Sequence, residues 1–196
     1  MISILICTYN HSNFLKNCIN SAIGKGEIIV VDDYSSDNTQ DVLSEFPTIT
    51  VIKNNTRKNL LESRKIAFEH SHGDYITFLD DDDFLHNIKE SEYDLLQGKI
   101  KTNRKSHQDW YDKYLYKGED FLSNKCHLDY HVWGKVFKRW VLEEVYKEIK
   151  MSYVFMGEDS ILMENVFNKI KTYKYTDELF YTYHHGSGYS SHRELL

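Results

Sequence analysis

Proline and cysteine are both scarce in this sequence. Pro47 is the only proline among 196 residues, which argues against a proline-rich linker between domains. The cysteines are Cys7, Cys18 and Cys126, an odd number without the paired spacing of a structural zinc site. This usage argues against a disulfide-stapled secreted scaffold, so we expect a reducing compartment, the cytoplasm.

Basic clusters and long apolar segments are also absent. The chain carries 24 lysines and arginines against 30 aspartates and glutamates, a formal net charge of -6, and it has no block of five basic residues. We therefore expect no nucleic-acid partner, because binding phosphates would need such residues. No segment approaches the roughly 18 apolar residues of a membrane span, and Met1 is not followed by the basic start of a secretory signal. We expect no transmembrane segment, while peripheral contact with a membrane through a short amphipathic face stays open.

Apolar runs alternate with amphipathic stretches in the first part of the sequence. Buried strands are predicted over residues 2–7, 27–31, 49–52 and 75–79. Helices are predicted between them, over about 11–22, 39–45 and 60–70. This alternation is typical of an α/β fold built from right-handed βαβ units, so we expect a mostly parallel central sheet flanked by helices.

The pattern becomes less regular after residue 85. We predict a polar helix over residues 88–100, a loop over 102–116, a strand over 132–137, helices over 138–149 and 159–170, and edge strands over 171–175 and 179–183. We interpret residues 1–196 as a single domain with two halves. A nucleotide-binding half extends to about residue 85, and a smaller half covers about 86–196.

Polar clusters follow three of the predicted strands. They are Thr8-Tyr9-Asn10, Asp32-Asp33 and the four carboxylates Asp80-Asp81-Asp82-Asp83. Because the ends of parallel strands meet at one edge, we expect the clusters to line a single crevice, where α/β sheets bind ligands. Neighbouring carboxylates repel one another unless a cation lies among them. Mn²⁺ or Mg²⁺ that also holds a diphosphate fits such oxygen ligands, and a solvated acidic loop is the alternative.

In order along the chain, these motifs resemble those of the family 2 glycosyltransferases, which have the GT-A fold. The segments that carry the resemblance are Ile4-Leu5-Ile6-Cys7-Thr8-Tyr9-Asn10, Val30-Val31-Asp32-Asp33-Tyr34-Ser35-Ser36-Asp37, Ser63-Arg64-Lys65, Phe78-Leu79-Asp80-Asp81-Asp82-Asp83, Trp133-Gly134-Lys135-Val136-Phe137, Gly157-Glu158-Asp159 and Tyr183-His184-His185-Gly186-Ser187. They cover nearly the whole chain. The resemblance implies a GT-A domain whose first half binds a nucleotide sugar and whose second half binds the acceptor and supplies a catalytic base.

The resemblance implies a donor site for a nucleotide sugar, with a UDP-sugar as the favoured donor. Thr8, Tyr9 and Asp33 would hold the base, and Arg64 would lie beside them. Asp80 would approach the ribose.

It also implies a metal site next to the donor. Asp82, with Asp80, would ligate Mn²⁺ or Mg²⁺ on the diphosphate, and His184 or His185 would reach the metal or diphosphate. We include Asp81 in the donor site, although the family usually has a small residue there. Tyr34 is a second departure, because it stands where the family usually has glycine.

For the reaction itself, the resemblance implies a metal-dependent inverting displacement that moves a hexose to a hydroxyl of a glycan, glycoprotein or lipid. Asp159 would be the general base, while Trp133, Lys135 and Glu158 are candidates for acceptor contacts. Two alternatives stay open. A sugar nucleotidyltransferase would also need strand-end carboxylates, but residues 8–13 lack its glycine-rich basic loop. A non-catalytic module that binds sugar or a partner is the other alternative, and the presence of both Asp82 and Asp159 argues against it.

Overall fold

The computed structural model describes residues 1–105, 130–149 and 157–184. Its strands are β1 (Ile2–Thr8), β2 (Glu27–Asp32), β3 (Thr50–Lys53), β4 (Tyr75–Asp80), β5 (Phe84–Leu85), β6 (Leu95–Thr102), β7 (Lys135–Lys138) and β8 (Tyr173–Tyr183). Its helices are α1 (Ser12–Ala22), α2 (Thr39–Ser44), α3 (Leu60–Glu69), α5 (Arg139–Glu148) and α6 (Glu158–Lys169). Every strand and helix predicted before residue 85 is confirmed to within about two residues, the usual uncertainty of element boundaries.

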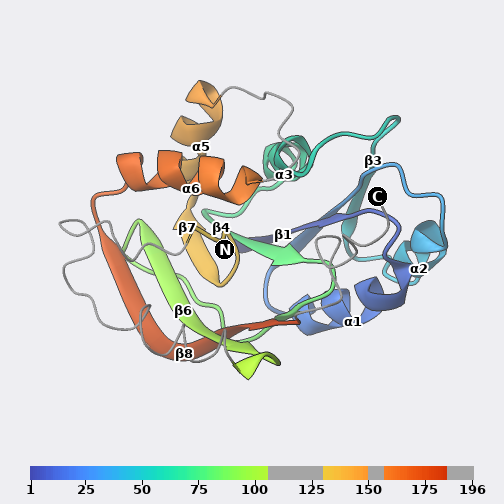
Figure 1. The fold of residues 1–196 in the computed structure, drawn as a ribbon, viewed down its shortest axis with the longest axis horizontal. Coiled ribbons are helices and arrows are strands. Elements are labelled where there is room, and N and C mark those ends of the chain that lie inside the picture. The colour runs from blue at the N-terminus through green and yellow to red at the C-terminus, as the bar shows by residue number, and fades with distance from the viewer. Residues whose placement is uncertain (106–129, 150–156, 185–196) are drawn as a thin grey trace.

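All the described strands form one sheet with the order β3-β2-β1-β4-β7-β6-β8-β5 (Figure 1). β1 pairs in parallel with β2 and β4, and β2 pairs in parallel with β3. β7 is antiparallel to both of its neighbours, whereas β6 and β8 are parallel to each other. The predicted α/β fold with a mostly parallel sheet is therefore confirmed.

Helices cover both faces of the parallel strands. Figure 1 shows α3, α5 and α6 on one side of the sheet and α1 and α2 on the other. Leu5 and Val31 pack into the core beneath α3 and α6, while Ile4 and Val30 pack into the core that includes Leu15 of α1. Because successive strand residues point to opposite faces, continuous apolar runs such as β1 fill both cores at once.

The helix predicted over residues 88–100 is wrong. Residues 86–94 form no helix, and β6 begins at Leu95. From Gly98 onward its residues alternate between buried and exposed, as in a strand. β6 pairs with β7 on one side and β8 on the other. Strand pairing to segments distant in the sequence therefore overrides the local helical spacing, as tertiary contacts often do.

The two edge strands predicted near the end of the chain are also wrong. They form one strand, β8, which lies inside the sheet between β6 and the short β5. Most of the loop predicted over 102–116 falls outside the described residues. Within the described ranges, no helix is both long and apolar enough to cross a bilayer.

Gly98 provides a test of the corrected segment. A Cβ added there would overlap the ring of Phe180, which is fully buried in β8. We expect Gly98→Ala to lower the free energy of unfolding by about 1–3 kcal/mol, the usual cost of overpacking. In an exposed helix the same change would raise it by about 1 kcal/mol. Urea denaturation measures the sign, and adding Phe180→Leu should recover part of the loss. A stabilised Gly98→Ala protein would contradict the β6–β8 pairing.

Candidate functional site

The ends of β1, β2 and β4 are level with one another. Thr8 pairs with Asp32 of β2, and the preceding Cys7 pairs with Asp80 of β4. The strand order reverses between β1 and β4, because β2 and β3 lie on one side of β1 and β4 lies on the other. Such a switch point is where open α/β sheets bind ligands. The structure therefore brings the three predicted clusters to one edge.

Asp33 is held by the loop that follows β3. Its Oδ1 accepts hydrogen bonds from Asn54 Nδ2 at 2.7 Å and from the Lys58 backbone N–H at 2.9 Å. Its Oδ2 lies 3.1 Å from Arg57 Nε. The Arg57 guanidinium also lies over the Tyr9 ring, 3.2 Å from the ring centroid. Tyr9 and Asp33 thus both contact a third side chain, Arg57, which no pattern in the sequence singled out.

Two non-glycine residues with left-handed backbones flank this part of the crevice. Asn10 follows β1 with a φ of 51°, and Tyr34 follows β2 with a φ of 70°. The two turns are tied together, because Ser35 Oγ accepts from the Asn10 N–H at 2.9 Å and Asn10 Oδ1 accepts from the Ser36 N–H at 2.7 Å. Left-handed backbone costs energy for such residues and clusters at functional sites. Glycine at 34 would relieve this strain, whereas Tyr34 is held there with an exposed ring.

Thr8 and Asp32 differ in how their side chains are satisfied. Asp32 is fully buried and accepts from the Ser35 N–H at 2.9 Å and from Gln40 Nε2, so it serves to close the turn. Thr8 is buried, yet its Oγ1 has no hydrogen-bond partner in the described part of the chain. A buried hydroxyl that lacks a partner is costly, and a ligand at this edge of the sheet would supply one.

Arg64 joins two carboxylates that are far apart in the sequence. Its guanidinium forms ion pairs with Asp159 and, at 3.3 Å, with Asp80. The Arg64 side chain is only 3% exposed, whereas those of Asp80 and Asp159 are 33% and 24% exposed. Burial lowers the pKa of the guanidinium, but the two carboxylates outweigh it and raise the pKa, so Arg64 stays charged. The buried cation therefore fixes both acids while leaving them within reach of a ligand.

Asp159 lies in the first turn of α6, after Gly157, whose φ of 90° favours glycine. Its Oδ1 bonds Arg64, and its Oδ2 accepts from the Val132 N–H at 3.3 Å. Glu158 is the first residue of the same helix and is partly exposed. A carboxylate in the first turn is also stabilised by the helix dipole.

The four consecutive aspartates have different partners. Asp81 Oδ1 lies 2.8 Å from His11 Nδ1, at the start of α1. Asp83 is fully buried, and it accepts hydrogen bonds from the Tyr181 hydroxyl at 2.6 Å and from the His184 backbone N–H at 2.7 Å. Tyr181 in turn accepts from the Asp80 N–H at 3.2 Å. Asp81 and Asp83 therefore connect the acidic turn to α1 and to the end of β8.

Crowding of the acids changes their protonation. Burial raises the pKa of the Asp80 carboxyl to about 7, with Arg64 opposing the shift and the charges of Asp159 and Asp82 adding to it. Burial also raises the pKa of Asp83 to about 9, and the charges of Asp80 and Asp82 contribute. At neutral pH the Asp83 carboxyl therefore holds a proton, and the Asp80 carboxyl holds one part of the time.

A hard cation fits the chemistry of this turn. Asp80 and Asp82 have carboxylate oxygens, and a cation would relieve the part of the raised pKa values that comes from the charges of neighbouring acids, which adds to the larger effect of burial. Among the described residues, no three metal-binding side chains form a complete site, so a diphosphate and water would have to supply further ligands. His184 is tied to Asp83 through its backbone and packs edge-on against Phe84, with ring centroids 4.9 Å apart. His185 lies outside the described residues.

Trp133 and Lys135, proposed to contact an acceptor, are both buried. Trp133 is 3% exposed and stacks on Tyr181 and Tyr183, with ring centroids 4.8 Å and 5.1 Å away. Lys135 is 1% exposed, and its Nζ donates to the His131 carbonyl at 2.7 Å. In this structure both side chains support the packing behind the acidic turn.

Sequence reasoning missed Asn54, Arg57, His11 and Tyr181. Asn54 had a usable signal, because it follows the end of β3 as the polar clusters follow the other strands. For Arg57, His11 and Tyr181 no local pattern exists, since each acts through a residue at least 24 positions away, as in the contact of Arg57 with Asp33.

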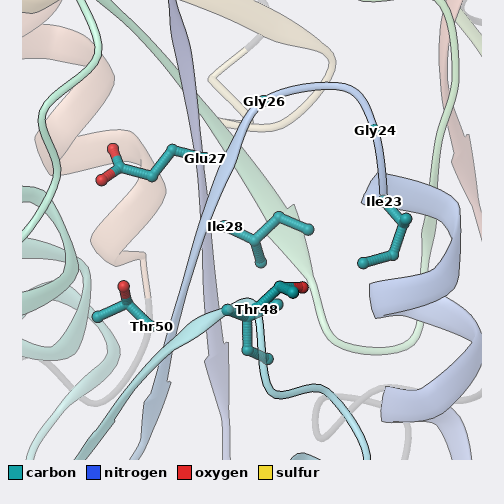
Figure 2. A pocket seen from close by; sticks show the side chains of 8 residues that line it. Ile23, Gly24, Gly26, Glu27, Ile28, Thr48 and Thr50 are labelled. Carbon is teal, nitrogen blue, oxygen red and sulfur yellow. The ribbon is translucent and has the colours of Figure 1, made fainter.

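A separate pocket lies at the opposite end of β2. It has a volume of about 220 Å³ between the end of α1 and the start of β3 (Figure 2). Its lining residues are Ile23, Gly24, Gly26, Glu27, Ile28, Thr48, Ile49 and Thr50. Because β2 begins at Glu27 and Asp33 follows its other end, this pocket is not part of the crevice.

Comparison with known proteins agrees with this arrangement. The sequence model of the family described as Glycosyl transferase family 2 matches residues 3–145. The glycosyltransferase GlyA of Streptococcus pneumoniae serotype 4 is 24% identical over 213 residues, covering 93% of this chain but 30% of GlyA.

Two solved structures share the fold. Residues 1–349 of S. aureus TarS in complex with UDP-GlcNAc superpose with a TM-score of 0.76 at 18% identity, covering 93% of this chain and 58% of the TarS chain. The mannosyltransferase PcManGT of Pyrobaculum calidifontis in complex with GDP-Man and Mn²⁺ gives a TM-score of 0.67 at 14% identity, covering 93% of this chain and 56% of PcManGT. The predicted GT-A fold is confirmed by these likenesses.

The protonation of Asp83 gives a pH prediction. Unfolded aspartate has a pKa of about 3.9, so between about pH 4 and pH 9 the folded protein retains a proton at Asp83 that the unfolded chain has lost. Its contribution to the free energy of unfolding therefore falls as pH rises through this window. The stability difference between wild type and Asp83→Asn, measured by urea denaturation without metal, should shift in favour of Asp83→Asn as pH rises. Comparing the two proteins also removes the contribution of His86, which both contain. Burial lowers the pKa of His86, so its effect on stability has the opposite dependence on pH. A pH-independent difference would contradict the assignment.

Proposed function

The chain belongs to glycosyl transferase family 2, and on this premise we propose that it transfers a hexose from a nucleoside diphosphate sugar to an acceptor hydroxyl. The proposed donor is a UDP-sugar, and the proposed acceptor is a glycan, glycoprotein or lipid. One observation carries the proposal. Arg64 pairs with Asp80 at the end of β4 and with Asp159 at the start of α6, which brings a donor-site acid and a candidate base into one buried network.

The proposed base site consists of Thr8, Tyr9 and Asp33. The Tyr9 ring offers a face for stacking, Asp33 offers a carboxylate oxygen to a base N–H, and Thr8 has an unsatisfied hydroxyl. TarS, which shares the fold, was solved with UDP-GlcNAc, and this supports a uridine carrier for the present chain.

We propose that Asp82 and Asp80 hold Mn²⁺ or Mg²⁺, with His184 or His185 nearby. A bound cation would stabilise the charge that develops on the leaving diphosphate. Within the protein, Asp83 and Tyr181 fix the turn that carries these acids, and Arg64 supplies positive charge beside Asp80. The Mn²⁺ complex of PcManGT supports this part of the proposal.

Asp159 is the proposed general base of an inverting displacement. Its side chain is partly exposed, and its bonds to Arg64 and to the Val132 N–H orient the carboxylate. It would accept the proton of the acceptor hydroxyl while that oxygen attacks the anomeric carbon and the diphosphate leaves. The helix position gives it a fixed direction, and Glu158 beside it, which is partly exposed, is a proposed acceptor contact.

The metal role predicts that nucleotide binding depends on Asp82. UDP with Mn²⁺ should raise the melting temperature of the wild-type protein more than UDP alone, because a ligand that binds only the folded state stabilises it. Asp82→Asn should lose the Mn²⁺-dependent part of this shift. Asp177→Asn, which removes an exposed carboxylate of β8, is the matched control and should behave as wild type. An equal Mn²⁺-dependent shift in melting temperature in Asp82→Asn and wild type would exclude the metal role of Asp82.

The base role predicts a separation of binding from transfer. Asp159→Asn should retain UDP binding but lower the transfer rate by about 100-fold or more, the usual contribution of a general base. Glu164→Gln, an exposed change in the same helix, should leave transfer intact. Release of UDP from a panel of nucleotide sugars in the presence of candidate acceptors measures the rate. Transfer at a near-normal rate in Asp159→Asn would exclude this residue as the base.

A further inference from the structure

Arg57 occupies the place between Tyr9 and Asp33 that the proposed function assigns to the nucleotide base. Its guanidinium carbon lies 3.2 Å from the centroid of the Tyr9 ring, at stacking distance. Its Nε lies 3.1 Å from Asp33 Oδ2. One planar group therefore makes both contacts at once, an aromatic stack and an N–H contact with a carboxylate.

A pyrimidine base with an imide N–H would make the same two contacts. Uracil is planar, can stack on an aromatic ring, and carries N3–H between two carbonyls, where a carboxylate oxygen can accept it. Guanidinium and uracil differ in charge but share this combination of a flat face and an in-plane donor. Both would need the Tyr9 face and the same Asp33 oxygen.

Of the two Asp33 oxygens, only Oδ2 could accept a hydrogen bond from either of these groups. Oδ1 already accepts from Asn54 Nδ2 at 2.7 Å and from the Lys58 N–H at 2.9 Å, both parts of the loop that follows β3. Oδ2 is the oxygen that faces Arg57. Because Asp33 is 8% exposed, a base cannot approach Oδ2 without displacing the Arg57 side chain.

We propose that Arg57 competes with the nucleotide base. Its guanidinium fills the base subsite in the free protein and leaves that subsite when the donor binds. This inference rests on the proposed function. The Arg57 side chain can move while the loop stays in place, because the loop is anchored on both sides of this residue. The Asn54 N–H bonds the Asp32 carbonyl at 2.9 Å, and Asn59 caps α3 by accepting from the Glu62 N–H at 2.8 Å. The Arg57 side chain itself is 42% exposed.

The competition also sets a preference among bases. A base that presents an N–H donor in its plane, as uracil does, can take over the contact with Asp33 Oδ2. Cytosine has an acceptor nitrogen at the same position, so it would displace Arg57 without replacing its N–H contact. The exchange therefore favours uridine nucleotides over cytidine nucleotides, because an unreplaced contact leaves a nearly buried carboxylate without its partner.

Calorimetric titration with UMP and CMP, without metal, tests the competition. Arg57→Ala should bind UMP about three- to thirtyfold more tightly than wild type, the factor expected from losing a cation–π contact and a partly exposed ion pair. Arg57→Lys keeps the charge but not the planar stack, so its affinity for UMP should lie between those of wild type and Arg57→Ala. Lys53→Ala removes an exposed cation at the end of β3 and should bind as wild type. CMP should bind more weakly than UMP to every variant.

Nuclear magnetic resonance gives a readout that does not depend on affinity. The Nε–H signal of Arg57, identified by its loss in Arg57→Ala, should be shifted by the Tyr9 ring in the free protein and should move toward the position of an exposed arginine as UMP is added. UMP binding to Arg57→Ala with wild-type or lower affinity would overturn the inference and leave the proposed function standing. If neither protein binds UMP, the proposed function and the inference both fail.

Discussion

The buried guanidinium of Arg64 is the interaction on which the rest of this site depends. It lies beneath the crevice, is almost inaccessible to solvent, and holds Asp80 and Asp159 from one point. An uncompensated charge at such a depth is very unfavourable, so cation and carboxylates each require the others to be present. This requirement links the end of β4 to the start of α6, two elements that lie far apart in the sequence. It explains how the proposed donor-site acid Asp80 and the proposed base Asp159 are held in a fixed relation to each other.

The acidic turn at the end of β4 supplies negative charge opposite the positive charge of Arg64. The pKa values of Asp83, which is buried, and Asp80, which is partly buried, are raised by burial and by the charges of neighbouring carboxylates. Asp81 contacts His11, and Asp83 bonds Tyr181, while Asp82 and Asp80 are the acids that we propose for a cation. A divalent cation, which would also hold a diphosphate, would relieve the repulsion among these acids. The binding energy of such a ligand would in turn help to hold the turn in its folded form.

The sequence predicted the parallel strands and the edge where they end, because β1, β2 and β4 are continuous apolar runs followed by polar clusters. Thr8, Asp33 and Asp80 could be placed together from that pattern alone. It could not predict β6, since the spacing of Leu95, Leu96 and Ile100 suits a helix until β7 and β8 pair with the segment. Nor could it predict that Arg64 meets a residue 95 positions away, or that Arg57 covers Tyr9, because such contacts depend on how distant helices and loops pack on the sheet.

The central claim is that the strand ends form one site in which Asp82 meets a cation and Tyr9 and Asp33 meet a base. The most direct measurement is a crystal structure of the protein grown with Mn²⁺ and UDP, with anomalous scattering recorded to locate the manganese. The account predicts an anomalous peak in contact with an Asp82 oxygen and with the diphosphate, and a uracil ring on Tyr9 in place of Arg57. Manganese bound far from Asp82, or uracil bound away from Tyr9 and Asp33, would contradict it.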